Sequence, residues 1–134
     1  MNRIYLLAVA LLVMSFSVAQ TKAEQKPTPE TVLVTFQVRQ GQEARMQQVL
    51  SRAWATYVRL GMVRRVPHLL LKNTDEKGNT TMFEILSWKD SSVPDNAGPE
   101  VRELWNEMEG LCEKRTEQPG IDFKQVEPIP LNGR

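Results

Sequence analysis

The residues best suited to chemistry in this chain are its one histidine and a carboxylate inside an apolar segment. His68 opens the segment HLLLK, and Glu84 lies in the middle of TTMFEILSW. The intervening NTDEKGN is rich in turn-forming residues and predicts a hairpin between the two segments. Pairing of Lys72 with Thr80 then places His68 directly opposite Glu84, where an imidazole and a carboxylate can exchange a proton.

The same two residues also have a structural interpretation, which we favour. A carboxylate among Met82, Leu86 and Trp88 is costly to bury unless it is paired. His68 beside Glu84 then satisfies a buried charge before it serves any catalytic purpose. A shift of two residues in the strand register separates the pair, so both interpretations depend on the predicted register.

Four further side chains are candidates for binding a ligand, namely Gln37, Arg39, Tyr57 and Trp88. A sheet that sets the first strand beside the third brings Gln37 or Arg39 to Glu84. The Tyr57 hydroxyl suits a phenolic ligand, or else it covers the edge of the core with its oxygen in solvent. The indole of Trp88 provides an aromatic wall. The predicted site therefore combines polar and aromatic side chains around Glu84.

The composition excludes several classes of site. One cysteine and one histidine are too few for a zinc, haem or iron-sulfur centre, so we predict neither a metal nor a cofactor. Cys112 has no partner for an intramolecular disulfide, and its place on the apolar stripe of a predicted helix favours a small buried side chain over a nucleophile. Because 17 basic residues are balanced by 16 acidic ones without a dense basic run, no nucleic-acid partner is expected.

Residues 1–19 have the features of a secretory signal peptide. A short positive start precedes an apolar run that ends at Phe16, and small residues follow up to Ala19. The run is shorter than the roughly 20 residues that span a bilayer. We expect cleavage after Ala19, or alternatively after Ala23, and export to the periplasm or out of the cell, with no membrane attachment afterwards.

The remaining chain divides into three parts. Residues 20–30 are polar and predict a flexible lead-in, residues 31–127 form one predicted domain, and residues 128–134 are a proline-containing tail. Within the domain, changes in hydrophobic period predict the order strand, helix, strand, strand, helix, strand. The predicted strands are 31–39, 68–72, 80–88 and 121–126, and the helices lie between residues 42 and 61 and between residues 99 and 112.

This order of elements predicts an α+β fold of the ferredoxin-like type, βαββαβ, in which both helices cover one face of a four-stranded antiparallel sheet. Alternation along each strand assigns side chains to faces. The predicted helix-covered face carries Val34, Phe36, Leu69, Leu71, Phe83 and Ile85, and the predicted open face carries Leu33, Thr35, Gln37, Arg39, His68, Leu70, Lys72, Met82, Glu84, Leu86 and Trp88. This mixture is too apolar for open water and too polar for a closed core, so we expect a second copy of the chain to cover it in a homodimer.

Several segments resemble one superfamily. The opening TFQVRQGQEARMQQVL, the strand ending FEILSWKD and the helix EVRELWNEMEGL are similar to the dimeric α/β-barrel proteins, which include the antibiotic-biosynthesis-monooxygenase-like domains. The resemblance spans roughly residues 31–126. The stretch RLGMVRRVPHLLLK, with EILSWKD, also resembles uncharacterised exported bacterial members. In the superfamily two ferredoxin-like subunits pack their sheets face to face, and small molecules bind between helices and sheet or in the barrel.

The resemblance implies no catalytic residue for this chain. Haem-degrading members rely on a set of asparagine, tryptophan and histidine, and His68 lies outside that pattern. Two functions follow as hypotheses. The first is an exported homodimeric domain that binds a small ligand or acts as a non-catalytic module. The alternative is a cofactor-independent monooxygenase-like enzyme for a small apolar or aromatic molecule, with His68, Glu84 and Arg39 around a cavity of about 300 Å³ or more.

Overall fold

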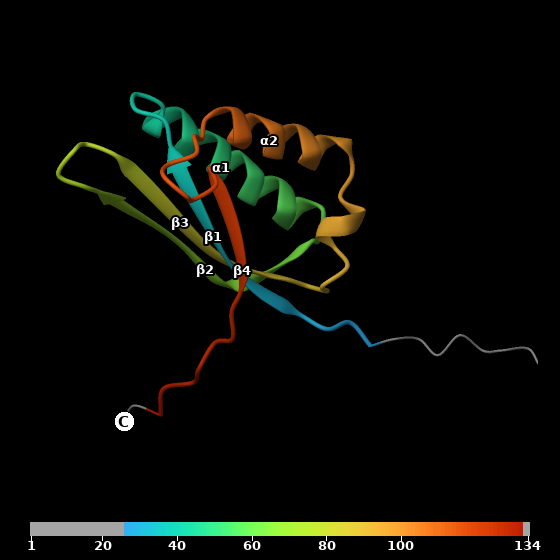
Figure 1. Ribbon diagram of the computed structural model, residues 1–134. Coiled ribbons are helices and arrows are strands. Elements are labelled where there is room, and N and C mark those ends of the chain that lie inside the picture. The colour runs from blue at the N-terminus through green and yellow to red at the C-terminus, as the bar shows by residue number, and fades with distance from the viewer. Residues whose placement is uncertain (1–25, 133–134) are drawn as a thin grey trace, which may run out of the picture.

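The computed structural model of this protein describes residues 26–132. The predicted signal peptide and both predicted cleavage sites lie outside the described residues. The elements follow the order β1 (Glu30–Val38), α1 (Glu43–Arg59), β2 (Val63–Thr74), β3 (Thr80–Trp88), the 3-10 helix η1 (Pro94–Asn96), α2 (Pro99–Gly110) and β4 (Ile121–Gln125) (Figure 1). Among residues 26–132, no helix is both long and apolar enough to cross a membrane.

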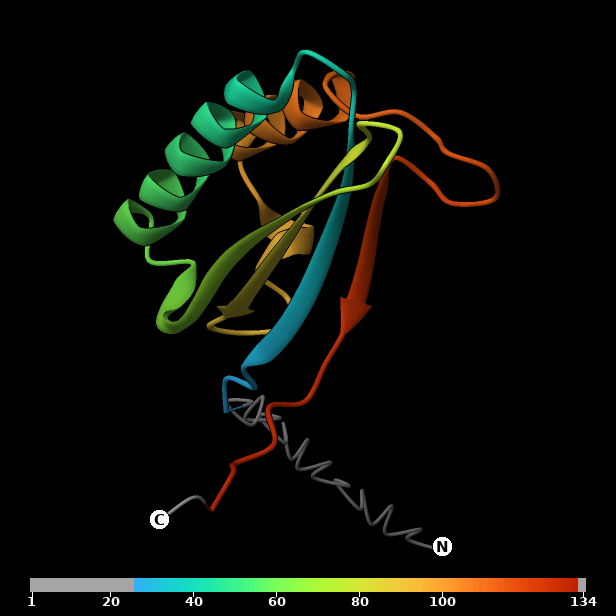
Figure 2. The same ribbon diagram turned by 90° about the vertical axis from the view of Figure 1, so that its left-hand side faces the viewer.

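The strands form one four-stranded antiparallel sheet in the order β2-β3-β1-β4. Both helices lie on the same face of this sheet (Figure 2). The core between the two layers contains buried side chains from β1, α1, β2, β3 and α2, with Val38, Met46, Val49 and Val101 fully shielded from solvent, and Ile121 of β4 packs against it. The predicted ferredoxin-like fold is therefore confirmed.

Local signals set the limits of the helices. The stripe of apolar side chains in α1 includes Met46 and Leu50, which are buried against the sheet. The helix stops before Gly61, whose φ of 68° is one that side chains with a Cβ rarely adopt. Helix α2 begins at Pro99, where the missing N–H costs no hydrogen bond. Both helices thus occupy the segments that the hydrophobic period predicts.

The hairpin of β2 and β3 has a different register from the predicted one. Lys72 pairs with Met82 and His68 with Leu86, a shift of two residues. The cause lies in the turn, where Asp75 Oδ1 accepts hydrogen bonds from the backbone N–H groups of Lys77 and Asn79, each at 2.9 Å. This compact turn leaves residues 73 and 74 free to extend the strand.

Strand β2 also begins five residues before the predicted start, at Val63. Its pairing with β3 is irregular between Arg64 and His68, and Pro67 lies in this irregular part. Because β2 is an edge strand, a proline without an N–H group is tolerated there. The strand therefore extends beyond its predicted start through a stretch of irregular pairing.

The structure corrects the predicted faces of β2 and β3. Val34 pairs with Glu84, so the buried set Met82, Glu84, Leu86 and Trp88 lies on the helix-covered face rather than the open one. His68 follows its neighbour Leu86 to that side. The set Phe83, Ile85, Leu69 and Leu71, predicted to face the helices, lies on the open face instead. The predicted sides of Val34 and Phe36 are correct.

Candidate functional site

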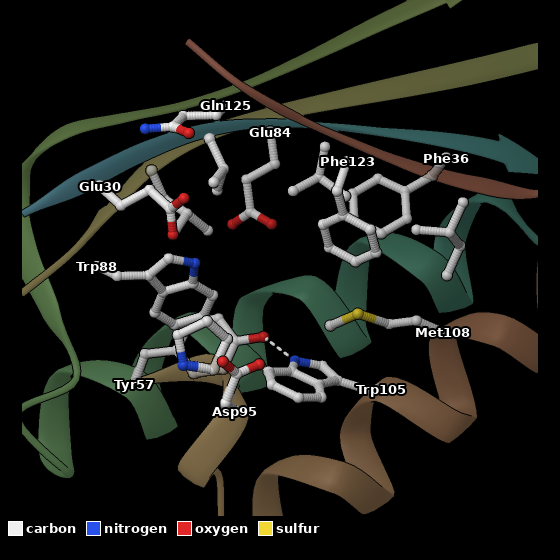
Figure 3. A pocket seen from close by; sticks show the side chains of 15 residues that line it. Glu30, Phe36, Tyr57, Glu84, Trp88, Asp95, Trp105, Met108, Phe123 and Gln125 are labelled. Atoms are coloured by element: carbon white, nitrogen blue, oxygen red, sulfur yellow. Dashed lines mark hydrogen bonds between the residues drawn. The ribbon is translucent and has the colours of Figure 1, made fainter. Parts of the chain in front are cut away.

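A cavity of about 450 Å³ lies between the sheet and the helices. Its floor is formed by β1, β3 and β4, and its walls by α1, α2 and η1 (Figure 3). Its lining is mainly apolar and aromatic: Glu30, Val32, Val34, Phe36, Tyr57, Glu84, Leu86, Trp88, Pro94, Asp95, Trp105, Met108, Ile121, Phe123 and Gln125. Three candidates from the sequence, Tyr57, Glu84 and Trp88, therefore meet in one cavity.

Glu84 supplies the buried polar group of this cavity. The residue is only 4% exposed, and its carboxyl group points toward Trp88, Tyr57 and Phe123 in Figure 3. Burial raises the pKa of Glu84 above its ordinary value, and the hydrogen bond and charge of His68 act in the opposite direction without cancelling the effect. A carboxyl group with a raised pKa is a stronger base than an ordinary carboxylate.

His68 is not among the residues that line the cavity, but it is the only described residue that forms a hydrogen bond with the Glu84 carboxyl group. The distance from His68 Nε2 to Glu84 Oε1 is 3.0 Å, and the imidazole is 25% exposed. Trp54 stacks on the imidazole with a centroid separation of 3.5 Å and an interplanar angle of 5°. The predicted proximity of His68 and Glu84 is thus confirmed. The register is shifted by two residues, so the two side chains meet diagonally rather than directly opposite each other. The expectation that such a shift separates the pair is wrong.

Tyr57 and Trp105 form a second polar contact at the cavity wall. Trp105 Nε1 donates a hydrogen bond of 2.6 Å to the Tyr57 hydroxyl oxygen. Tyr57 is 3% exposed, so the alternative with its oxygen in solvent is wrong. Burial raises the pKa of Tyr57, which keeps the hydroxyl protonated. The phenol can therefore donate a hydrogen bond to a ligand while it accepts one from Trp105.

Gln37 and Arg39 do not belong to this cavity. Gln37 pairs with Thr81 in the sheet, on the face opposite to Glu84. Its side-chain oxygen accepts hydrogen bonds from Thr81 and Arg115, and its nitrogen donates to Gln118. Arg39 is exposed beyond the end of β1. The predicted contact of Gln37 or Arg39 with Glu84 is wrong. Glu84 pairs with Val34 of β1, which leaves Arg39 five residues further along the chain and Gln37 on the other face of the sheet.

Cys112 is a buried thiol just beyond the end of α2 rather than within the helix. It is 5% exposed, and burial raises its pKa to about 11. A thiol with so high a pKa is a weak nucleophile at neutral pH, in agreement with the predicted structural role. Within residues 26–132, no three His, Cys, Asp or Glu side chains are grouped in a way that could hold a metal ion.

Residues outside the predicted site complete the cavity. Trp105 and Met108 of α2 project from the predicted apolar stripe, and Phe36 from the predicted buried side of β1. Their apolar character predicts burial but does not distinguish a packed core from the wall of a cavity. Phe123 of β4, which is 67% exposed, stands at the cavity edge in Figure 3.

No protein-family model matches the sequence, and no curated protein matches it either. Solved structures do match the fold. SnoaB, a cofactor-independent oxygenase from Streptomyces nogalater, has a TM-score of 0.56 at 20% identity, with 78% of this chain and 98% of SnoaB covered. Rv0793 from Mycobacterium tuberculosis has a TM-score of 0.52 at 12% identity, with 79% and 100% covered.

A candidate antibiotic biosynthesis monooxygenase from Chloroflexus aurantiacus has a TM-score of 0.51 at 10% identity, with 79% of this chain and 98% of that protein covered. At such identities the similarity concerns the fold and not the chemistry. This chain therefore shares the ferredoxin-like fold of these three structures.

Proposed function

We propose that this protein binds a small aromatic molecule in the cavity between sheet and helices, with Glu84 as the polar contact of the ligand. The observation that carries the proposal is a nearly fully buried carboxyl group inside an apolar cavity of about 450 Å³. Ligand sites in proteins are typically about 300–1,000 Å³, mainly apolar, with few polar groups that fix orientation. Burying a carboxyl group is costly, so a site that uses it explains its presence better than core packing does.

One oxygen of Glu84 remains available for the ligand. Oε1 contacts His68, whereas no described residue forms a hydrogen bond with Oε2. Among the described residues, every fully shielded side-chain oxygen or nitrogen has a partner, so Oε2 reaches the cavity space. A ligand with a donor group can therefore bind Oε2 without breaking the contact with His68.

A second function is a cofactor-independent monooxygenase, favoured by the contact of Glu84 with His68. In this reaction the Glu84 carboxylate takes a proton from an acidic methylene group, and the resulting carbanion reduces O2. Overall, the methylene compound and one O2 give the corresponding ketone and one water, so the carbon loses four electrons and O2 gains four. The reduced oxygen takes a proton back from Glu84, so that both methylene hydrogens leave in the product water, and the partly exposed His68 connects this carboxyl group to solvent. The oxygenase activity of SnoaB belongs to that protein and lends this function an analogy of fold.

Filling the cavity is expected to abolish ligand binding. Val34 lines the cavity floor, and Val34→Phe places a phenyl ring in its space. The neutral apolar dye N-phenyl-1-naphthylamine should bind the unaltered chain and should bind Val34→Phe at least about tenfold more weakly, a difference of about 1.4 kcal/mol. Fluorescence titration measures both affinities. Val66→Phe, at a residue that is 73% exposed, is the matched control and should bind as the unaltered chain does.

Equal dye affinity in Val34→Phe and Val66→Phe, or no binding by any of the three proteins, contradicts the proposed function.

An oxygen electrode reading on the same samples separates the two functions. With 2-tetralone, which has an acidic methylene group, the enzyme function requires O2 uptake that falls by roughly 10²–10⁴-fold in Glu84→Gln. Dye binding without such uptake supports the binding function alone.

We further propose export of the chain and its assembly as a homodimer. The support for assembly is the open face of the sheet, where Leu69 and Leu71 are each 48% exposed beside the half-buried Leu33, Phe83 and Ile85. A contiguous apolar face of this kind is best covered by the same face of a second copy. The support for export is the sequence of residues 1–19.

The homodimer proposal predicts a dimer at micromolar concentration by light scattering. Ile85→Lys introduces a charge at the centre of the open face and should yield a monomer with unchanged circular dichroism, because the side chain points away from the helices. Glu76→Lys, in the exposed hairpin turn, should remain dimeric. If the unaltered chain is a monomer at this concentration, the homodimer proposal is wrong. The export proposal has a separate test, which is mass spectrometry of the mature N-terminus to detect cleavage.

A further inference from the structure

The cavity carries an excess of negative charge. Three carboxyl groups line it: Glu84 from β3, Glu30 from β1 and Asp95 from η1. No lysine, arginine or histidine is among its lining side chains. In Figure 3, Glu30 and Asp95 lie on opposite sides of the Trp88 ring, and Glu84 lies across the cavity from Asp95. The charged side chains that line the cavity are thus all acidic.

These carboxyl groups have few cationic partners within the chain. Among residues 26–132, neither Glu30 nor Asp95 forms a salt bridge. Glu84 contacts His68 through Oε1 alone. Glu84 lies between low-dielectric apolar walls, where an incompletely compensated charge attracts an opposite charge more strongly than it does in water. Asp95 is exposed and Glu30 is half-buried, so water and salt screen their charges and their attraction for a cation is weaker.

Aromatic rings form most of the remaining wall. Trp88 meets Tyr57 at 66° and Trp105 at 72°, so the three rings present differently oriented faces and edges. Phe36 and Phe123 extend this wall from β1 and β4. The faces of tryptophan, tyrosine and phenylalanine rings attract cations, and aromatic cages of this composition bind ammonium groups.

Resting on the function proposed above, we propose that the ligand is an organic cation, an aromatic or alkyl molecule with a substituted ammonium group. The ammonium group lies near Glu84 and the Trp88 ring, and the apolar part fills the space toward Phe36 and Met108. Burial raises the pKa of Glu84, so a cation that favours the ionised carboxylate competes there with a proton. An anionic ligand of the same shape meets three carboxyl groups and is rejected.

The test compares three ligands of similar shape with different charge. Benzyltrimethylammonium, its neutral carbon isostere neopentylbenzene, and phenylacetate are each used to displace N-phenyl-1-naphthylamine from the full chain. Benzyltrimethylammonium carries a charge that does not titrate, so its preference reports the protein alone. We expect it to bind at least about tenfold more tightly than neopentylbenzene, and phenylacetate to bind most weakly.

Two variants locate the origin of the preference. Glu84→Gln should reduce the ratio of ammonium to neutral affinity by several-fold, and the double variant Glu30→Gln with Asp95→Asn should reduce it by a smaller factor, because these two side chains are less buried. Glu109→Gln removes an exposed carboxyl group of α2 outside the cavity and should leave the ratio unchanged. A ratio near one in the unaltered chain, or a ratio unaffected by either cavity variant, overturns the organic-cation inference.

The dye distinguishes this failure from that of the proposed function. If the dye binds and neopentylbenzene displaces it as well as benzyltrimethylammonium does, the cavity is a ligand site and its charge preference is wrong. If the dye does not bind the unaltered chain, the proposed function fails, and the organic-cation inference fails with it.

Discussion

Replacement of Trp88 by alanine is expected to lower the free energy of unfolding by about 3–5 kcal/mol, the range for truncation of a large buried aromatic side chain. Trp88 is 5% exposed, and its ring centroid lies 5.2 Å from that of Tyr57 and 6.4 Å from that of Trp105. Because the ring already borders a cavity, its removal enlarges a space that the surrounding side chains cannot close. Urea denaturation followed by circular dichroism measures the change.

Two companion variants make the result interpretable. Small domains are stable by about 5–15 kcal/mol, so Trp88→Ala can leave little folded protein, whereas Trp88→Phe keeps one aromatic ring and should cost less than half as much. Phe123→Ala removes an aromatic side chain from the same cavity, but one that is 67% exposed, and should change stability by less than about 1 kcal/mol. Equal losses in Trp88→Ala and Phe123→Ala contradict the buried role of Trp88.

The fold is predictable from this sequence because its elements have clear periods and clear stops. The α1 stripe that includes Met46 and Leu50, followed by Gly61, indicates the helix and its end. Pro99 marks the first turn of α2 in the same way. The order of strands and helices then leaves few topologies, and the observed sheet is the expected one.

Hydrophobicity alone does not predict which side of β3 faces the helices, because large apolar side chains lie on both sides of this strand. Phe83 and Ile85 share their side with small hydroxyl residues and no charge, which favours burial, while Met82, Leu86 and Trp88 share their side with Glu84. The larger set is buried under the helices despite the carboxyl group. The pairing of Val34 with Glu84 decides the outcome, and pairing is a property of the whole sheet rather than of one strand.

The contact of His68 with Glu84 survives an incorrect register for a geometric reason. Residues two positions apart on neighbouring strands lie on the same face, and long side chains reach across the diagonal. His68 stands opposite Leu86, and Glu84 is the next residue on that face of β3. The stacking of Trp54 on the imidazole holds the ring in place, but this helix-to-sheet contact has no signal in the sequence.

Replacement of Glu84 by glutamine is expected to raise the free energy of unfolding at pH 8 by roughly 1–3 kcal/mol, the scale for burying an incompletely compensated polar group. Burial raises the pKa of Glu84 in the folded chain above the ordinary value of 4.5. As pH rises above that value, the unfolded chain releases this proton first, so the folded chain binds more protons and loses stability. Glutamine does not titrate, so the variant avoids this loss.

The pH dependence identifies Glu84 as the cause. Below about pH 4 the carboxyl group is protonated in both states, so Glu84→Gln and the unaltered chain should differ little there and diverge as pH rises. Glu109→Gln, which removes an exposed carboxyl group, should show no such divergence. Urea denaturation at several pH values provides the measurement. A Glu84→Gln variant less stable than the unaltered chain at pH 8 would mean that His68 compensates the buried carboxylate fully, which makes the pair a structural one and removes the main reason to regard Glu84 as a ligand contact.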